Sequence, residues 1–373
     1  MKITIIIAKK ISECSNSWDD FLPGNHHLKA SHLQAFEDAK IDNIENHYLQ
    51  VFFKDKLIGL VYLQLFQFKH QHLNFAQPPG FFSRCIQFIL PAQLPLLVCG
   101  HLFRIDFPGF YFKSPAQQPL VFEAIKLFTQ HLKKCKPSGI ILKDCAAIFV
   151  EENYKPFGYH FFNGDVTMEL SRRPHWHSFE DYLKDLNKNY LQRAKKIIRA
   201  FITIQKKELT APEILEHAAE IENLYWNVVN KQTIKLGTVN AMYFYTLKTD
   251  LEKNFEFHAL YENNIMVGFY TFIFYEHTME THFIGMDYEA NKKYKIYFNI
   301  LFLSTQKMIE RKYAALELGR TAREPKENLG ALPRQIFNYI KVKNPIVKIT
   351  LHYFLKRFNK TASHKLLERS PLK

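Results

Sequence analysis

The sequence predicts an α+β protein made of two similar mixed-sheet domains in tandem. Three observations lead to this prediction. The chain has 373 residues, which exceeds the usual size of one compact core; two hairpin-like segments share one design; and each hairpin is preceded by helix-like sequence and followed by strand-rich sequence and a further helix. Hydrophobic residues make up 47% and aromatic residues 15%, so the chain can fill two cores and is not disordered.

The two predicted hairpins are Leu49–Phe66 and Phe255–Phe274. In each, two β-rich runs are joined by a polar turn, Lys54–Lys56 in the first and Asn263–Asn264 in the second. A glycine, Gly59 or Gly268, follows early in the second run at the matching position. An internal repeat is the preferred interpretation, and a chance likeness between two hairpins is the alternative.

The elements that follow each hairpin repeat as well. Helical spacing over Pro119–Cys135 precedes a predicted strand at Gly139–Leu142, and helical spacing over Tyr294–Lys312 precedes a predicted strand at Ala314–Leu318. The apolar run within Met1–Lys10 is too short for a signal peptide and is predicted to be a first strand.

A helical pair is predicted between the two halves, over residues 178–236. Ser178, followed by acidic residues, is a good helix start, and one long amphipathic helix is expected from there to Phe201. Ala211–Val229 is the second helix of the pair. The polar face of the first helix is basic, so it binds an anionic partner or stays solvated; its cations are Lys184, Lys188, Lys195, Lys196 and Arg199.

Arg193 differs from those cations because it projects onto the margin of the apolar stripe. A guanidinium there is expected to be half-buried and to need a partner. We interpret Arg193 as a substrate-binding residue, and a structural salt bridge to a neighbouring carboxylate is the alternative.

The predicted domain limits follow from these elements. The N-terminal domain covers residues 1–170, the C-terminal domain covers 171–341 including the helical segment 178–236, and a basic amphipathic tail covers 342–373. The tail either lies on anionic lipid or packs as a helix with a solvated face.

The charge and cysteine content limit the partners and the compartment. With 50 Lys+Arg against 36 Asp+Glu, the formal charge of +14 favours an anionic partner such as a nucleotide cofactor, RNA or an acidic lipid surface. No apolar stretch approaches the roughly 20 residues that span a bilayer, so we predict a cytoplasmic protein whose only membrane contact would be peripheral, on the inner face. The cysteines have no metal-ligand spacing and are predicted to be reduced thiols: Cys14, Cys85, Cys99, Cys135 and Cys145.

The segment Leu316–Ala331 is the strongest site candidate. A short apolar run ends in Gly319, and fixed charges follow: Arg320, Arg323, Glu324 and Lys326. Polar groups at a strand end are where open sheets often bind ligands. A solvated loop with a structural salt bridge is an equal alternative.

The sequence resembles the FemAB-like and BioF2-like branch of the GNAT acyltransferase superfamily. The resemblance rests on the two hairpins with their glycines and on three segments: Asn189–Lys196, Gly285–Tyr288 and Gly319–Ala331. It implies two GNAT-like (acyl-CoA N-acyltransferase-like) domains in tandem, with a helical pair inserted in the second. It also implies transfer of an acyl group from an activated carrier to an amine, with acyl-CoA as co-substrate in ordinary GNAT enzymes and aminoacyl-tRNA in FemAB enzymes.

One departure from the family pattern concerns the donor. GNAT enzymes hold the CoA pyrophosphate in a glycine-rich turn that opens a helix. The equivalent position here begins at Asp287 and contains no glycine, although Lys292, Lys293 and Lys295 could replace some of the lost contacts. Acetyl-CoA is therefore in doubt, and aminoacyl-tRNA or a protein-bound donor stays open.

Acyl transfer to an amine suggests roles for the remaining candidates. Glu324 or Asp287 would accept the proton of the amine, and Tyr294 or Tyr297 would protonate the leaving group. Substrate-binding roles fall to four cations: Arg193, Arg320, Arg323 and Lys326. Neither His277 with His282 nor His175 with His177 comes with a third ligand, so no metal is predicted.

The predicted function is an N-acyltransferase with a polyanionic acyl donor, an amine acceptor such as a lipid or cell-envelope precursor, and no tightly bound cofactor. We expect the acceptor between the two domains near Arg320–Lys326. The alternatives are a FemAB-type aminoacyltransferase and a non-catalytic protein that binds RNA or anionic lipid on a degenerate acyltransferase core. No DNA partner is predicted, because the recognised DNA-binding modules are missing from the sequence.

Overall fold

The computed structural model describes residues 2–14, 17–69, 93–133, 136–146, 148–231, 238–342 and 371–373. Over these residues the chain forms two compact units. Unit 1 comprises Met1–Asp165, Thr233–Thr238 and Gln335–His364, and unit 2 comprises Val166–Gln232, Val239–Arg334 and Lys365–Lys373. Cys85, Cys135 and most of the predicted tail 342–373 lie outside the described residues.

Unit 1 is a six-stranded mixed sheet with an additional short strand and helices. Its strands are β1 (Thr4–Ala8), β2 (Ile44–Phe53), β3 (Lys56–Lys69), β4 (Gln93–Cys99), β6 (Gly139–Cys145), β13 (Leu332–Val342, from Gln335 on) and the short β5 (Phe110–Phe112) beside β3. Its helices are α1 (Ser17–Phe21), α2 (Ala30–Asp38), α4 (Leu120–His131) and α5 (Glu151–Tyr154).

Unit 2 is a second mixed sheet of the same kind. Its strands are β7 (His160–Ser171, from Val166 on), β8 (Gln205–Glu208), β9 (Phe255–Glu262), β10 (Ile265–Tyr275), β11 (Thr278–Met286) and β12 (Ala315–Glu317). Its helices are α6 (Phe179–Asp185), α7 (Lys188–Ala200), α8 (Ala211–Glu216), α9 (Ala218–Val229), α10 (Ala241–Leu251), α11 (Tyr288–Tyr294), α12 (Ile296–Glu310) and α13 (Arg323–Glu327).

The two sheets have the same ladder order, which confirms the predicted repeat. In unit 1 the order β1-β2-β3-β4-β6-β13 contains three antiparallel pairings, then one parallel and one antiparallel pairing. In unit 2 the order β8-β9-β10-β11-β12-β7 gives the same sequence of pairings. The α+β tandem architecture predicted from the sequence is therefore correct.

Both predicted hairpins form, and their turns explain why. Lys54 and Asp55, and likewise Asn263 and Asn264, have positive φ at both central positions, as the two-residue turns that suit twisted strands require. The register of each hairpin then shifts directly before its glycine, between Leu57 and Gly59 in the first and between Met266 and Gly268 in the second. The repeat thus extends to the β-bulges.

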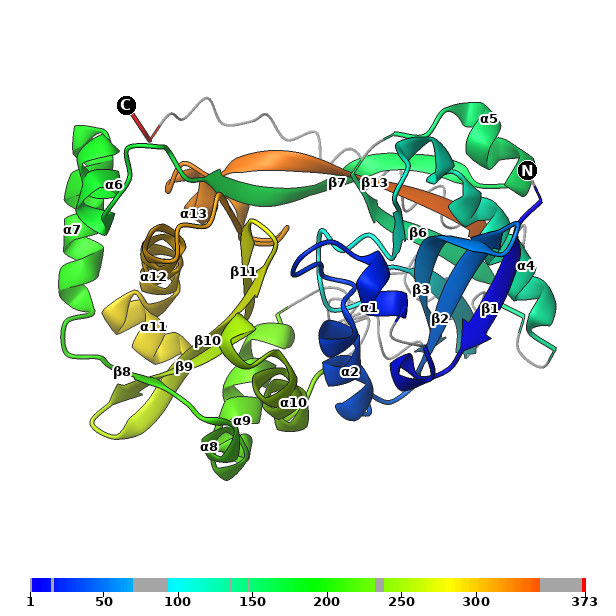
Figure 1. The fold of residues 1–373 in the computed structure, drawn as a ribbon. Helices are drawn as coiled ribbons and strands as arrows, with labels where there is room; N and C mark the ends of the chain where they lie inside the picture. The colour runs from blue at the N-terminus through cyan, green and yellow to red at the C-terminus, as the bar shows by residue number, and fades with distance from the viewer. Residues whose placement is uncertain are drawn as a thin grey trace, which may run out of the picture. The chain divides into compact units, whose positions relative to one another are not determined.

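The sheet of unit 2 is covered on both faces. Phe272, Met279 and Leu316 share one apolar cluster with residues of α12. On the other face, Phe269 and Phe283 contact Phe244 of α10. Figure 1 shows α12 on one side of β9–β11 and α9 and α10 on the other. A strand in this part of the sheet therefore buries both of its faces.

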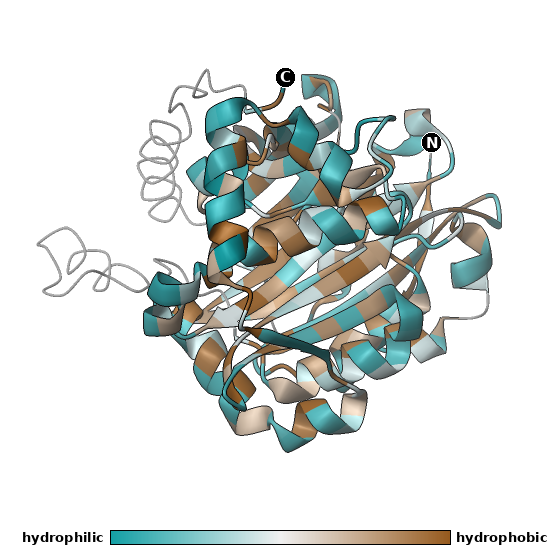
Figure 2. Ribbon diagram, turned by 90° about the vertical axis from the view of Figure 1, so that its left-hand side faces the viewer, coloured by the Kyte–Doolittle hydropathy of each residue, from teal (hydrophilic) through white to brown (hydrophobic). Residues whose placement is uncertain are grey.

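The helical segment differs in detail from the prediction. A capping box formed by Ser178 and Asp181 starts α6, as expected, but the long helix is broken between Asp185 and Lys188. At the break, the backbone N–H of Asn187 donates to the carbonyl of Pro371 at 2.8 Å. In Figure 2, where the left side of Figure 1 faces the viewer, the outer helical surfaces are largely hydrophilic. Between α7 and α8 the chain also adds β8 to the sheet, an element that the helical pattern did not predict.

The close packing over Gly59 gives a stability prediction. A Cβ built on Gly59 would lie 2.2 Å from a ring carbon of Phe112, the residue opposite it on β5, so Gly59→Ala forces a buried ring to move. We expect Gly59→Ala to lower the free energy of unfolding by about 1–3 kcal/mol in urea denaturation. Gly139→Ala is the matched control, because its nearest neighbour is the flexible end of Leu96 at 3.1 Å. Equal effects of the two substitutions would contradict this account.

Candidate functional site

Strand β12 lies between β11 and β7, and at its end it separates from β11. Its ladder with β11 covers three residue pairs and ends at Glu280 opposite Glu317, whereas β11 continues to Met286. On the other side, β12 stays with β7, since the N–H of Leu318 donates to the carbonyl of Met168 at 2.9 Å. The chain after Glu317 therefore follows β7 and leaves β11.

The part of β11 beyond the last pair is accessible although β11 is an interior strand. Residues 281–284 are half-buried, while Glu280 before them and Gly285 after them are buried. The side chain of His282 is only 1% exposed, so the exposure of this residue lies at its main chain. The parting of β11 and β12 thus leaves accessible backbone beside Glu317.

Glu317 is a buried carboxylate at this point, with 2% of its surface exposed. Its Oε1 accepts hydrogen bonds from the hydroxyl of Thr167 and from the N–H of Gly319, the latter at 2.6 Å. Burial raises the pKa of Glu317, and the charge of Glu280 raises it further; the two hydrogen bonds and the charge of Lys326 act in the opposite direction. The alternation of apolar residues in the sequence predicted that Leu316 and Leu318 are buried but gave no sign that Glu317 is.

Lys326 is the second buried charge, with 3% of its surface exposed. The chain turns after β12 through Gly319 and Ala322, which have positive φ, and α13 brings Lys326 back over the strand end. Its Nζ donates to the carbonyl of Gly319 at 3.1 Å and to that of Thr321. Burial lowers the pKa of Lys326, the charge of Glu317 raises it, and the charge of Arg323 lowers it further.

The other predicted residues of this segment lie around Lys326. Arg323 and Arg320 are half-buried, and Glu324 is exposed. The positive charge of Arg323 lowers the pKa of Lys326. Sequence reasoning named Lys326 as a substrate-binding residue but missed Glu317. The signal that could have found Glu317 was a single carboxylate inside a strand of apolar residues.

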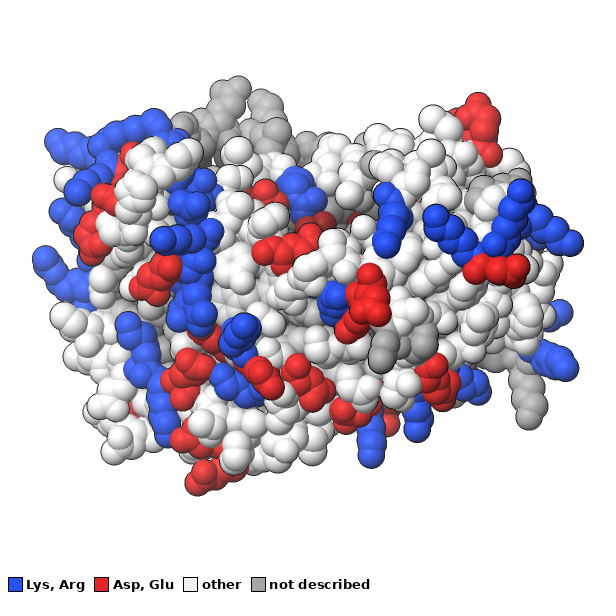
Figure 3. All heavy atoms as spheres, viewed as in Figure 1, with Lys and Arg blue, Asp and Glu red and all other residues white. Residues whose placement is uncertain are grey.

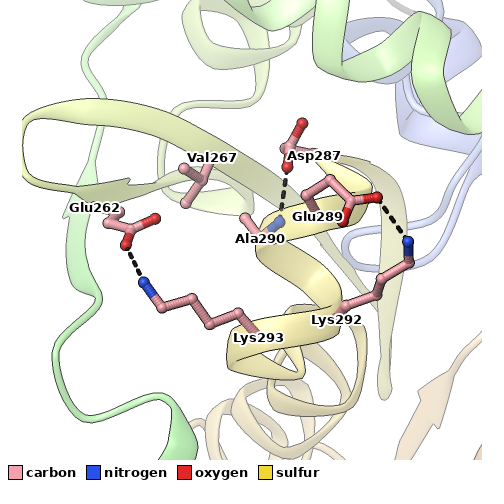
Figure 4. A pocket seen from close by; sticks show the side chains of 7 residues that line it. All are labelled: Glu262, Val267, Asp287, Glu289, Ala290, Lys292 and Lys293. Atoms are coloured by element: carbon pink, nitrogen blue, oxygen red, sulfur yellow. Dashed lines mark hydrogen bonds and ion pairs between the residues drawn. The ribbon is translucent and has the colours of Figure 1, made fainter.

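Three of the remaining predicted residues, Asp287, Lys292 and Lys293, line an open pocket of about 650 Å³ at α11 (Figure 4), while Tyr294, Lys295 and Tyr297 follow in the chain and are not among its lining residues. The side chain of Asp287 caps this helix by accepting from the N–H of Ala290 at 2.7 Å. Tyr294 is buried and donates to Glu262, while burial raises the pKa of Tyr297 to about 12. The helix start therefore already holds a carboxylate of the chain itself.

The three lysines expected to hold a donor's phosphates have partners within the chain. Lys292 is 2.6 Å from Glu289, and Lys293 is 2.8 Å from Glu262. Lys295 donates to the main-chain carbonyl of Lys292 at 2.7 Å. Figure 4 shows the two ion pairs on either side of the pocket. The pocket wall combines three carboxylates with two paired lysines and is not a basic cradle.

Arg193 is exposed, not half-buried as expected. Its guanidinium carbon lies over the ring of Phe298 on α12, 5.2 Å from the centroid. This stacking on an aromatic ring takes the place of the anticipated anionic partner, because the apolar stripe of α7 faces α12 at this position.

Two of the four histidines considered as metal ligands contact carboxylates. His175 lies 2.7 Å from Asp185, and His282 lies 2.6 Å from Glu280. In the described part of the chain, ligand atoms that could hold a metal also converge at Glu208, Glu256 and His258. Both carboxylates already form ion pairs. Glu256 contacts Lys307 at 3.0 Å and Arg311 at 2.6 Å, and Glu208 contacts Lys248 at 2.6 Å.

None of the described helices is long and apolar enough to span a lipid bilayer.

Comparison with known proteins identifies the fold. No protein-family model and no curated protein sequence matches the chain. Among solved structures, FemX superposes with a TM-score of 0.56 at 10% identity, over 94% of this chain and all (100%) of that one. L-PGS from Bacillus licheniformis gives 0.53 at 14% identity over 92% and 96% of the two chains. A tandem GNAT protein from the clavulanic acid biosynthesis pathway gives 0.52 at 9% identity over 92% and 99%.

These likenesses cover almost the whole chain, so the protein has the tandem GNAT fold. The predicted resemblance to the FemAB-like branch of GNAT proteins is confirmed at the level of the fold. At identities of 14% and below, the comparisons carry no information on which side chains act.

The buried Glu317 gives a prediction for the pH dependence of stability. Because its folded-state pKa lies above the ordinary value of 4.5, the folded protein holds a proton that the unfolded chain loses as the pH rises. The contribution of Glu317 to stability therefore falls with rising pH, and Glu317→Gln removes this loss. We expect the free energy of unfolding of Glu317→Gln, relative to the unchanged protein, to increase between about pH 5 and pH 8, by up to about 1.4 kcal/mol per pH unit for each proton.

Urea denaturation at several pH values measures this difference. Glu324→Gln is the control, because Glu324 is exposed on the same segment. Parallel stability curves for Glu317→Gln and the unchanged protein would show that Glu317 ionises as an ordinary carboxyl.

Proposed function

We propose that the protein is a GNAT-type N-acyltransferase that joins an acyl group to an amine at the end of β12, with Lys326 at the reacting centre. The observation that carries this proposal is the buried Lys326 above the point where β11 and β12 part. A perturbed lysine beside accessible strand backbone is typical of a functional site. The tandem GNAT fold supports the same class of reaction.

The chemistry follows from the environment of Lys326. When the amine attacks the donor's carbonyl, negative charge develops on the carbonyl oxygen and then on the leaving atom. Two N–H donors of Lys326 are used by main-chain carbonyls, and no third acceptor is found for it among the described residues. The third donor stabilises that negative charge. Because burial lowers the pKa of Lys326, it can also give a proton to the leaving atom near neutral pH and take up the proton that the attacking amine nitrogen loses, so that the amide bond forms and the bond to the leaving atom breaks without net proton change on Lys326.

The accessible main chain of β11 provides a place for the donor. Residues 281–284 lie beyond the last pair with β12; the main chain of Phe283 is bonded to the hydroxyl of Thr271, and the exposed surface of His282 is main chain. The main chain at His282 is a hydrogen-bonding partner for the α-amino group or the ester carbonyl of an aminoacyl donor. We therefore assign the donor's carbonyl to the end of the gap, on the side of Glu317 and Lys326.

Two observations favour aminoacyl-tRNA over acyl-CoA as the donor. A pyrophosphate needs unpaired backbone N–H groups or free cations, but the start of α11 is capped by Asp287 and lined by Glu262 and Glu289. In contrast, the chain between Asp185 and Glu208 contains no acidic residue.

The cations of that segment form an exposed basic surface that suits a polyanion. We call it the α7 surface: Lys188, Arg193, Lys195, Lys196, Arg199 and Lys206. Figure 3 shows Lys and Arg side chains gathered over this end of unit 2, where Figure 1 has α6 and α7. Neutralising the phosphates of an RNA donor would release counterions and make its binding strongly dependent on salt.

Replacement of Lys326 tests the proposed function. With aminoacyl-tRNA and a panel of primary amines, we expect Lys326→Met to lower the rate of amide formation at least about 100-fold, as loss of one transition-state donor does. Binding of the tRNA, measured by filter retention, should change less than about three-fold. Lys253→Met, an exposed lysine of unit 2, is the control and should leave both values unchanged.

The same assay distinguishes the rival functions. Amide formation only from acetyl-CoA or long-chain acyl-CoA would keep the enzyme class but overturn the choice of donor. Binding of tRNA or anionic vesicles without turnover from any donor would favour the non-catalytic alternative. Full activity of Lys326→Met would contradict the proposed site.

A further inference from the structure

The candidate site continues on the far side of the β11–β12 ladder, through residues that have no role in the reaction described above. Glu280 is the register partner of Glu317, so the two side chains lie on the same face of adjacent strands, about 5 Å apart at their bases. Both residues are buried, with 3% and 2% of their surfaces exposed. Two buried carboxyl groups on neighbouring strands repel each other when both are charged, and the charge of Glu280 raises the pKa of Glu317.

A histidine and a tyrosine extend the pair away from Lys326. Nδ1 of His282 lies 2.6 Å from Oε1 of Glu280, and Nε2 of His282 lies 2.8 Å from the hydroxyl of Tyr243 on α10. The side chain of His282 is 1% exposed, and Tyr243 is equally buried. When Glu280 is ionised it can only accept, so Nδ1 of a neutral His282 then donates to Glu280 and Nε2 accepts from Tyr243.

On the other side of the pair, polar and charged groups of β7 and α13 surround Glu317. On β7, Glu169 is the opposite register partner of Glu317, but Arg334 neutralises it at 2.7 Å. Thr167 donates to Glu317, which is a neutral hydrogen bond. From α13, Lys326 and Arg323 contribute positive charge on the side of Glu317.

We propose that His282, oriented by Tyr243, keeps the negative charge on Glu280 and a proton on Glu317, and is thereby the positioning residue that sets the protonation of Lys326. A hydrogen bond from His282 favours the charged form of the carboxyl that accepts it, which is Glu280. Glu317 then stays neutral beside Lys326. A neutral neighbour leaves burial unopposed, so Lys326 loses its proton more readily than it would beside an ionised carboxyl.

The bulge in β11 explains how His282 reaches this position. The register between β10 and β11 shifts between Tyr270 and Phe272, so that His282 and Phe283 of β11 together lie opposite Thr271 of β10. Without the bulge, the alternation of the strand would carry a different residue toward α10. The inference rests on the proposed function, because it assigns His282 and Tyr243 an effect on Lys326 of the same site.

Substitution of His282 tests the proposal by the titration of Lys326, which can be followed by NMR on protein with labelled lysine side chains and does not require activity. We expect His282→Leu to raise the titration midpoint of Lys326 by about one to two pH units, because Glu317 becomes charged beside it. The alkaline limb of the pH–rate profile, where Lys326 loses its proton, should shift to higher pH by the same amount. Tyr243→Phe should give a smaller shift of the same sign, since it removes only the contact that orients the ring.

Two further variants separate this role from a structural one. His282→Asn keeps an N–H near the position of Nδ1 and should restore most of the midpoint. His258→Leu is the matched control, because His258 also bonds the glutamate two residues before it, Glu256 at 2.7 Å, on β9. It should leave the Lys326 midpoint unchanged.

Each outcome is decisive for one claim. An unchanged Lys326 midpoint in folded Tyr243→Phe and His282→Leu would overturn the role of His282, even if Lys326 is essential for activity. A shifted midpoint in a protein without transferase activity would support the charge arrangement and count against the proposed function. Equal shifts in the His258 and His282 variants would show a general effect of removing a buried histidine, which also contradicts the proposal.

Discussion

The arrangement of the site depends on one constraint: a carboxyl group and an ammonium group are both buried at the end of β12. Transfer of a charge from water into the protein interior costs several kcal/mol unless partners compensate it. Glu317 has the hydroxyl of Thr167 and the N–H of Gly319, and Lys326 has the carbonyls of Gly319 and Thr321. The turn after β12 therefore serves both groups, since its main chain donates to Glu317 and accepts from Lys326.

The fold explains why such a pair exists there. An interior strand whose two faces are covered by α12 and by α9 and α10 must bury every side chain that it carries, including a carboxylate. The parting of β11 and β12 then opens main-chain groups of β11 beside that carboxylate. Unit 1 has the same ladder order, but at the end of its parallel pair β4 and β6 the matching residues are Cys99 and Leu142. The repeat thus supplies a scaffold twice, while the buried carboxylate pair occurs in unit 2.

Local chemistry made much of the fold predictable, whereas burial and distant contacts did not follow from the sequence. The two hairpins were predicted correctly because Lys54–Asp55 and Asn263–Asn264 fix their own turns. The break between α6 and α7 was missed because it depends on a contact with Pro371, far along the chain. Lys326 was selected from a cluster of charges, but Glu317 was overlooked because alternation reveals one buried face and cannot show that helices cover the other.

The most direct test of this account is the titration of Lys326 in the unchanged protein. With 13C-labelled lysine, the Cε resonance of each side chain reports its ionisation, and Lys326→Arg assigns the resonance of interest. The account predicts one lysine resonance with a midpoint well below the ordinary value of 10.5, missing in Lys326→Arg. A midpoint near the ordinary value would contradict the burial of Lys326 and the site built on it.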